Sequence, residues 1–154
     1  DRLLKEEIDL FDSRDNIRFA YMGLEGATVM GPKPQLTRVF VNLINNAVQA
    51  IENAQAEAGE RGGEAFIGRI VLSLRLSTKE GFYDIVFEDN GPGVSDDNRA
   101  RLFTPNFTTK SNGTGLGLSI CRNILEKCDA EIFYSKSFAL KGACFTVRFP
   151  RKRS

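Results

Sequence analysis

The chain of 154 residues contains no histidine, which excludes a histidine base, a histidine-ligated metal and a phosphohistidine on this chain. The chain has 3 Cys, an odd number, and no CxxC pair. This pattern indicates that the cysteines are reduced core residues of a cytosolic protein. The net charge of +1 is too small to give the strongly positive surface that a general nucleic-acid-binding protein needs. No apolar run approaches the roughly 20 residues of a membrane span, and no signal peptide opens the chain. We therefore expect no contact of this domain with nucleic acid or membrane.

The sequence does contain enough apolar residues for a folded core, with a hydrophobic share of 42% that includes 12 Phe. The length fits a single domain over residues 1–154. The chain opens without Met, in the middle of an amphipathic pattern. We interpret it as a fragment of a longer protein.

Apolar periodicity predicts the elements. Residues at i, i+3, i+4 and i+7 predict a helix over residues 35–58 with one buried face, namely Leu36, Val39, Phe40, Leu43, Ile44, Ala47, Val48 and Ile51. A second helix has an expected inner face of Leu118, Cys121, Ile124, Leu125 and Cys128. Shorter helices are expected over residues 3–11 and 95–103, and residues 31–34 and 59–63 break the chain.

Alternation of apolar and polar residues predicts the strands, over residues 17–22, 27–30, 70–76, 83–87, 131–135 and 143–149. Residues 79–81 form the turn of a hairpin, and we expect Ile70, Leu72, Leu74 and Leu76 to share a buried face. Hairpins dominate and helices are few. The order predicts an α/β two-layer sandwich: a mixed, mostly antiparallel sheet with helices on one face.

A stripe of amides follows the edge of the long helix, formed by Asn42, Asn46, Gln49 and Asn53. Asn is a poor helix former, so these amides indicate a polar site, where the Asn46 carbonyl oxygen can bind a hard cation. A solvated helix flank is the alternative.

Two glycine-containing segments also suggest a ligand site. Asp89 stands at a strand end before Gly91 and Gly93, where a carboxylate can accept a hydrogen bond from a ligand amine. An ordinary turn is the alternative. Lys110 and the glycines of residues 113–117 precede a helix, and their backbone N–H groups can bind phosphates. Their spacing is neither a P-loop nor a dinucleotide fingerprint, and a plain connector is the alternative.

In this order the segments resemble the four nucleotide-binding boxes of the GHKL ATP-binding superfamily. Residues 42–47 (NLINNA) resemble the N box and residues 89–93 (DNGPG) the G1 box. Residues 102–110 (LFTPNFTTK) resemble the F box and residues 113–118 (GTGLGL) the G2 box. The sequences of the F box and the G2 box are similar to those of sensor histidine kinases of the nitrogen-regulation type. The resemblance spans nearly the whole chain and implies the superfamily's Bergerat ATP-binding fold.

The resemblance implies roles for individual residues, with ATP and Mg²⁺ as cofactors. Asp89 would bind the adenine amino group, and Gly91 and Gly93 would let the backbone approach the base. Asn46 would hold Mg²⁺, and Asn42 would line the phosphate side. Gly113, Gly115 and Gly117 would wrap the triphosphate, with Lys110 nearby. Phe103 and Phe107 would anchor a lid over about residues 90–112. The other residues expected to bind the nucleotide are Thr108, Thr109, Thr114, Leu116 and Leu118.

The sequence departs from many histidine kinases at Gln49, Ala50 and Ala143. Relatives often carry Lys, an aromatic ring and a small hydroxyl at these positions. A phosphate cation, a ring that stacks on adenine and a water-mediated adenine contact are therefore missing from their usual places. A non-catalytic nucleotide-binding or docking module is one alternative reading.

Asn42 bears on the remaining alternatives. GHKL hydrolases of the gyrase B, Hsp90 and mismatch-repair types carry a Glu four residues before the metal-binding Asn, and anti-sigma serine kinases also tend to carry an acid there. An amide cannot take a proton at neutral pH, so Asn42 favours a histidine kinase.

The resemblance implies a partner for the reaction. The domain would transfer the γ-phosphate of ATP to a His on a separate dimerisation domain of the same parent protein, for relay to an Asp of a response regulator. The parent is expected to be a homodimer that can be anchored in the inner membrane, with this domain in the cytoplasm.

Overall fold

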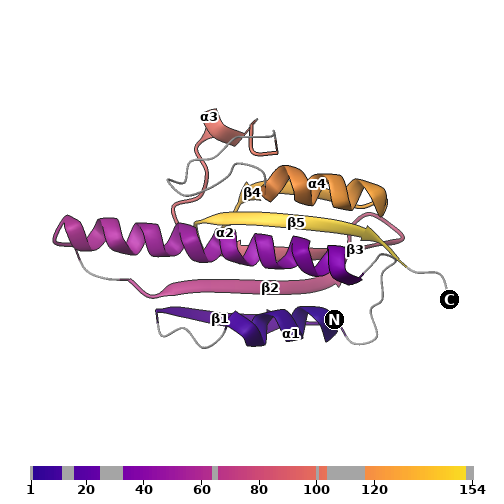
Figure 1. The fold of residues 1–154 in the computed structure, drawn as a ribbon, viewed down its shortest axis with the longest axis horizontal. Helices are drawn as coiled ribbons and strands as arrows, with labels where there is room; N and C mark the ends of the chain where they lie inside the picture. The colour runs from indigo at the N-terminus through magenta and orange to yellow at the C-terminus, as the bar shows by residue number, and fades with distance from the viewer. Residues whose placement is uncertain are drawn as a thin grey trace.

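One layer of the molecule is a five-stranded sheet, and the other is made of helices that lie across one face of it (Figure 1). The computed structural model describes residues 2–11, 16–24, 33–63, 66–99, 101–103 and 117–151. In chain order the elements are α1 (Arg2–Phe11), β1 (Ile17–Met22), α2 (Lys33–Glu60), β2 (Gly68–Leu76), β3 (Phe82–Asp89), α3 (Asp96–Arg99), α4 (Gly117–Lys127), β4 (Glu131–Lys136) and β5 (Ala143–Pro150).

The sheet has the strand order β1-β2-β3-β5-β4. β1 runs parallel to β2, and the three other pairs are antiparallel. The parallel pair follows from the long crossover through α2, because a tight turn can join only antiparallel strands. The predicted mixed, mostly antiparallel sheet is confirmed, as is the hairpin, in which Gly81 adopts a φ of 84°.

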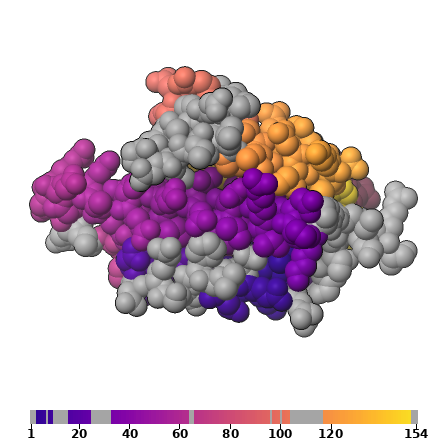
Figure 2. Space-filling view, viewed as in Figure 1, coloured from indigo at the N-terminus to yellow at the C-terminus, as the bar shows by residue number. Residues whose placement is uncertain are grey.

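α2 is the central helix of the second layer, and it contacts α1, α4, β2 and β3. Figure 2 shows it running across the near face of the molecule between α4 and α1. Its buried residues are the eight that the periodicity predicted. The helix begins at Lys33, so the predicted break through Pro34 is wrong. Pro34 fits the first helical turn because its missing N–H would have no partner there.

The core lies between α2 and alternate residues of the central strands. Ile70, Leu72 and Leu74 of β2 are buried as predicted, whereas Leu76 is 57% exposed. Its inclusion in the buried face was wrong, because it ends the strand beside the exposed hairpin turn. Phe40 of α2 packs its ring on Phe87 of β3, with centroids 6.1 Å apart.

Two other predicted elements differ from the structure, and one lies outside the described residues. α3 ends at Arg99, so the predicted helix through Phe103 is too long. The backbone carbonyl oxygen of Ser95 accepts the N–H of Arg99 at 3.1 Å, and residues 101–103 form only a turn. α4 ends at Lys127, so Cys128 lies just beyond the helix, although it is partly buried against the core as predicted. The strand expected over residues 27–30 falls outside the described part of the chain.

The opposite face of the sheet carries a row of alternating charges across four strands. Cross-strand pairing places Arg75 beside Asp84, Asp84 beside Arg148, and Arg148 beside Glu131. Arg148 donates from Nε to Asp84 Oδ1 at 2.8 Å and from Nη2 to Oδ2 at 3.1 Å. These hydrogen bonds raise the pKa of Arg148. Opposite charges on directly paired residues stabilise the sheet.

The described residues include no helix that is long and apolar enough to cross a membrane. All three cysteines are unpaired. Cys121 is fully buried, and this burial raises its pKa to about 11. Cys144 is buried in β5, whereas Cys128 is partly exposed.

Candidate nucleotide site

A buried carboxylate ends β3. Asp89 is 4% exposed, and its Oδ1 accepts the backbone N–H of Gly91 at 2.9 Å and that of Ala143 at 3.3 Å. Burial raises the pKa of Asp89, and the two N–H donors partly oppose that shift. No residue that the structure describes donates a hydrogen bond to the second oxygen, Oδ2. The backbone thus fixes one carboxylate oxygen and leaves the other to accept a donor.

The glycines after Asp89 are required by close contacts and by backbone conformation. A Cβ on Gly91 would lie 3.1 Å from Asp89 Oδ1 and 3.5 Å from the Cβ of Ala50 on α2. Gly93 has a φ of 75°, a conformation that side-chain-bearing residues rarely adopt. The backbone therefore passes closely between the carboxylate and α2.

Gly142, which the sequence analysis did not select, is as tightly constrained. A Cβ there would overlap the backbone oxygen of Asp89 and lie 2.7 Å from its Oδ1. Gly142 precedes Ala143, whose N–H reaches the same carboxylate. Ala143 thus acts on Asp89 through its backbone, whatever its side chain. The only sequence signal was the Lys-Gly pair before the last strand.

The amides of α2 lie on the part of the helix that leads up to Gly91. Asn46 and Ala50 are one helical turn apart, about 6 Å along the axis, and a Cβ on Gly91 would lie 3.5 Å from the Cβ of Ala50. Asn42, one turn earlier, is partly exposed and donates from Nδ2 to the sulfur of Cys121 on α4 at 3.7 Å. Of the predicted stripe, Asn42 and Asn46 are partly buried, whereas Gln49 and Asn53 are exposed.

Tyr134 of β4 holds the segment that follows Gly93. Its hydroxyl accepts the backbone N–H of Val94 at 2.9 Å, and the guanidinium of Arg99 lies over its ring at 5.1 Å from the centroid. The ring of Tyr134 packs edge-on against Phe145, with centroids 5.3 Å apart. Sequence reasoning missed Tyr134, because a tyrosine in a short strand gives no sign of a partner forty residues away.

Phe103 contacts the same aromatic group. Its ring meets Phe145 edge-on at 6.4 Å, and the guanidinium of Arg122 on α4 lies 6.0 Å from its centroid. The chain therefore returns to the aromatic pair of β4 and β5 at Phe103. The role of Phe103 as an anchor of the lid stays a prediction.

Asn90, the first residue of the predicted lid, is bound firmly to β2. Its side chain accepts the Arg69 N–H at 2.8 Å and donates to Ile67 O at 3.0 Å, while its own N–H donates to Arg69 O at 3.1 Å. Asn90 thus behaves as a continuation of the sheet.

These contacts refine the prediction of a lid over residues 90–112. Because the backbone N–H groups of Asn90 and Val94 both donate hydrogen bonds, we expect these two amides to exchange slowly, and we expect the rapid exchange that the lid prediction implies to lie after Val94. Hydrogen exchange followed by mass spectrometry checks this, with β2 as the slow reference. Protection of residues 95–112 equal to that of β2, without nucleotide, would contradict the lid.

The remaining predicted site residues are placed as follows. Gly117 opens α4, and no atom of the described residues lies within 4 Å of its Cβ position. Leu118 is partly buried against the core. The structure thus brings Asp89 and Gly91 close to Ala50 of α2, the helix that carries the amides, and holds Phe103 on β5. Outside the described residues lie Phe107, Thr108, Thr109, Lys110, Gly113, Thr114, Gly115 and Leu116.

Comparison with protein families assigns a class to this site and fold. Residues 31–153 match the family described as histidine kinase-, DNA gyrase B-, and HSP90-like ATPase. The chain therefore belongs to this family, and nucleotide binding is the property that its ATPase domains share.

The matched relatives narrow the class. The chain is 35% identical over 116 residues to the sensor histidine kinase ZraS of Salmonella typhimurium, covering 75% of this chain and 22% of that protein. The solved catalytic domain of the histidine kinase ThkA superposes with a TM-score of 0.78 at 26% identity, covering 97% and 91% of the two chains. The predicted sandwich and the predicted histidine kinase catalytic domain are confirmed. The nitrogen-regulation type stays a prediction.

A structure of ThkA in complex with the response regulator protein TrrA has the same fold. Its TM-score is 0.72 at 24% identity, covering 98% of this chain and 40% of that one. At that identity the likeness shows the fold alone.

Proposed function

We propose that this domain binds ATP and transfers its γ-phosphate to a histidine on a separate dimerisation domain of the same parent protein. One observation carries the nucleotide assignment: the buried Asp89 carboxylate, fixed through Oδ1 by two backbone N–H groups. A carboxylate oxygen accepts the adenine amino group and disfavours the carbonyl oxygen that guanine presents at the same place. Titration of the chain with ATP and with GTP tests this, and equal affinity for both would contradict it.

The other nucleotide contacts are proposed from the four boxes. Gly91 and Gly93 let the backbone approach the base, and Asn42 lines the phosphate side. The triphosphate is proposed to lie against Lys110 and the N–H groups of residues 113–118, which open α4 and favour anions. Thr108 and Thr109 belong to the proposed lid, which Phe103 and Phe107 anchor.

Mg²⁺ is proposed to accompany ATP. The donor set fits, because Asn46 offers an amide oxygen one turn from the Gly91–Ala50 contact and Mg²⁺ uses few protein ligands beside phosphate oxygens. The described residues hold no cluster of three acidic, Cys or His side chains that would form a metal site by itself. When bound, the ion would neutralise charge on the phosphates.

Replacement of Asn46 by alanine is expected to weaken binding of Mg²⁺–ATP at least about tenfold, and that of metal-free ATP much less. The lost group is a metal ligand in this proposal, so the difference appears only with the ion present. Calorimetry with and without Mg²⁺ measures both affinities. Asn53→Ala removes an exposed amide from the same helix and is the matched control. Equal losses with and without Mg²⁺ would exclude the metal role.

Hydrolysis is the second candidate reaction of this family, and Asn42 argues against it. Activation of water needs a group that can take a proton, and an amide has none to offer at neutral pH. The chain has no histidine to accept the phosphate itself. The acceptor is therefore proposed to lie elsewhere in the parent protein.

The partners follow from this reaction. The phosphorylated histidine is proposed to pass its phosphate to an aspartate of a response regulator. The structural neighbour ThkA, which was solved in complex with the response regulator protein TrrA, supports this proposal. We also propose that the parent is a homodimer, that it can be anchored in the inner membrane, and that this domain lies in the cytoplasm.

A further inference from the structure

The turn between β4 and β5 is closed by a buried serine. Ser137 is 2% exposed, and its hydroxyl donates to Glu88 Oε2 at 2.6 Å while accepting the N–H of Leu140 at 3.1 Å. A hydrogen bond from a hydroxyl to a carboxylate is charge-assisted and stronger than one between neutral groups. The turn is thereby attached to β3.

The backbone of the same turn also closes on Ser137. Its N–H donates to Gly142 O at 2.8 Å, and its carbonyl accepts the N–H of Lys141 at 2.8 Å. Lys141 adopts a φ of 67°, which is uncommon for a residue with a side chain and needs support from its surroundings. Ser137 therefore determines where Gly142 lies.

Glu88 and Asp89 are neighbours in β3, so their side chains point to opposite faces of the sheet. On one face Ser137 holds Glu88. On the other, Gly142 touches the backbone of Asp89, and the Ala143 N–H donates to its carboxylate. The Ser137–Glu88 hydrogen bond thus joins the end of β3 to the turn before β5, on the face of the sheet opposite to the Asp89 side chain.

We propose that Ser137 and Glu88 are positioning residues for nucleotide recognition, which hold the start of β5 so that the Ala143 N–H orients the Asp89 carboxylate. This inference rests on the proposed function, since it takes Asp89 as the group that binds the base. Neither side chain is expected to touch the nucleotide, because their hydrogen bond lies on the opposite face of the sheet.

The test compares ATP affinity with stability in Ser137→Ala, Glu88→Ala, the double variant and Glu88→Gln. Each alanine variant is expected to weaken ATP binding about three- to tenfold. The double variant is expected to lose no more than either single one, because both remove the same interaction. Glu88→Gln keeps an oxygen acceptor and is expected to retain most of the affinity. Affinities come from calorimetry with Mg²⁺–ATP, and melting temperatures from circular dichroism.

Asp84→Asn is the matched control, since Asp84 is a hydrogen-bonded carboxylate on the same strand and the same face, away from Asp89. It is expected to lower the melting temperature and to change ATP affinity less than about twofold. Amide exchange gives a readout without nucleotide: Ala143 loses protection in Ser137→Ala but not in Asp84→Asn.

The outcomes separate the two hypotheses. Unchanged ATP affinity in both alanine variants, with a lowered melting temperature, overturns the positioning role and leaves the proposed function standing. Additive losses in the double variant also overturn it. If the unaltered chain binds neither ATP nor GTP, the proposed function fails, and this inference fails with it. If Ser137→Ala does not fold, the Glu88 variants test the positioning role instead. They remove the same hydrogen bond, and Glu88 is partly exposed, so its replacement disturbs the core less.

Discussion

Replacing Asp89 with asparagine is expected to abolish ATP binding, with affinity at least about 100-fold lower, while the chain stays folded. The amide oxygen of asparagine can accept the two backbone N–H groups that Asp89 Oδ1 accepts now. The amide nitrogen then occupies the place of Oδ2 and presents a donor to the adenine amino group, which is itself a donor. The loss is therefore a repulsive contact as well as a missing hydrogen bond.

The fold is expected to tolerate this change because of the pKa of Asp89. Burial raises that pKa, so ionisation of Asp89 is less favourable in the folded chain than in the unfolded chain. Any stability from this raised pKa is present at low pH and is lost as pH rises from the unfolded-state value through the folded-state pKa. A neutral amide removes this loss at neutral pH. Circular dichroism with the same melting temperature or a higher one is the expected control.

The pH dependence of ATP binding gives a second measurement. Binding needs the ionised carboxylate as acceptor, so it is expected to weaken as pH falls through a pKa that lies above the ordinary value of an aspartate. Calorimetry over a pH series follows this, with a metal-free titration to separate effects on the triphosphate. Affinity in Asp89→Asn equal to that of the unaltered chain would falsify the adenine assignment.

The chain alone is expected to bind ATP without phosphorylating itself and without rapid hydrolysis. It has no histidine, so the acceptor atom of a histidine kinase is absent. Asn42 offers no base to activate water. Positioning the γ-phosphate lowers the barrier little when no acceptor stands in line with it. Addition of a separate helical domain with the phosphoacceptor histidine is expected to restore transfer in trans.

γ-Labelled ATP distinguishes these outcomes. The chain is incubated first alone and then with the histidine domain, and label on the protein and released phosphate are measured separately. A histidine-to-alanine variant of the added domain controls for non-specific labelling. Rapid phosphate release by the chain alone, removed by Asn42→Ala, would favour a hydrolase over a kinase.

Much of the fold could be predicted because local patterns and tertiary packing agree. The eight apolar positions of α2 are the ones that the helix buries, since a single helical stripe faces the sheet. Asp89, Gly91 and Gly93 could be selected because the strand end and the glycines stand together in the sequence. Element ends were harder, as α3 shows, because a cap predicts where a helix begins better than where it ends.

The rest of the site depends on contacts between residues far apart in the chain. Tyr134 reaches Val94, Ser137 reaches Glu88, and Gly142 meets Asp89 only after β4 and β5 join the sheet. The pairing of β5 with β3 sets these neighbours, and no local pattern encodes it. Such residues are found from the structure alone.

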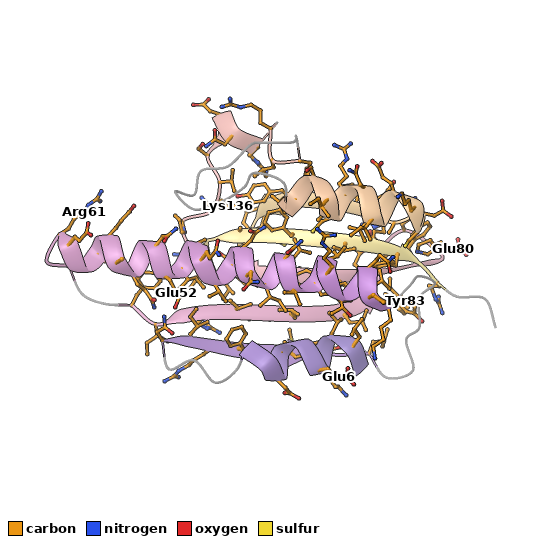
Figure 3. The ribbon with its side chains drawn as sticks, viewed as in Figure 1. Glu6, Glu52, Arg61, Glu80, Tyr83 and Lys136 are labelled. Atoms are coloured by element: carbon orange, nitrogen blue, oxygen red, sulfur yellow. The ribbon has the colours of Figure 1, made fainter. Side chains whose placement is uncertain are left out.

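The unequal burial of the three cysteines makes the unaltered chain suitable for site-selective labelling. Maleimide reagents attack the thiolate, so the fully buried Cys121 with a pKa of about 11 and the buried Cys144 should be slow to react. Cys128, just past the C-terminal end of α4, is the most exposed of the three thiols, and partial burial and the neighbouring Asp129 raise its pKa as well. A dye attached to Cys128 would require no substitution and would sit at the end of α4, the helix that follows the glycine-rich segment. Its fluorescence could report the binding of a nucleotide or of a partner protein in real time. Figure 3 shows the side chains of the described residues on the ribbon.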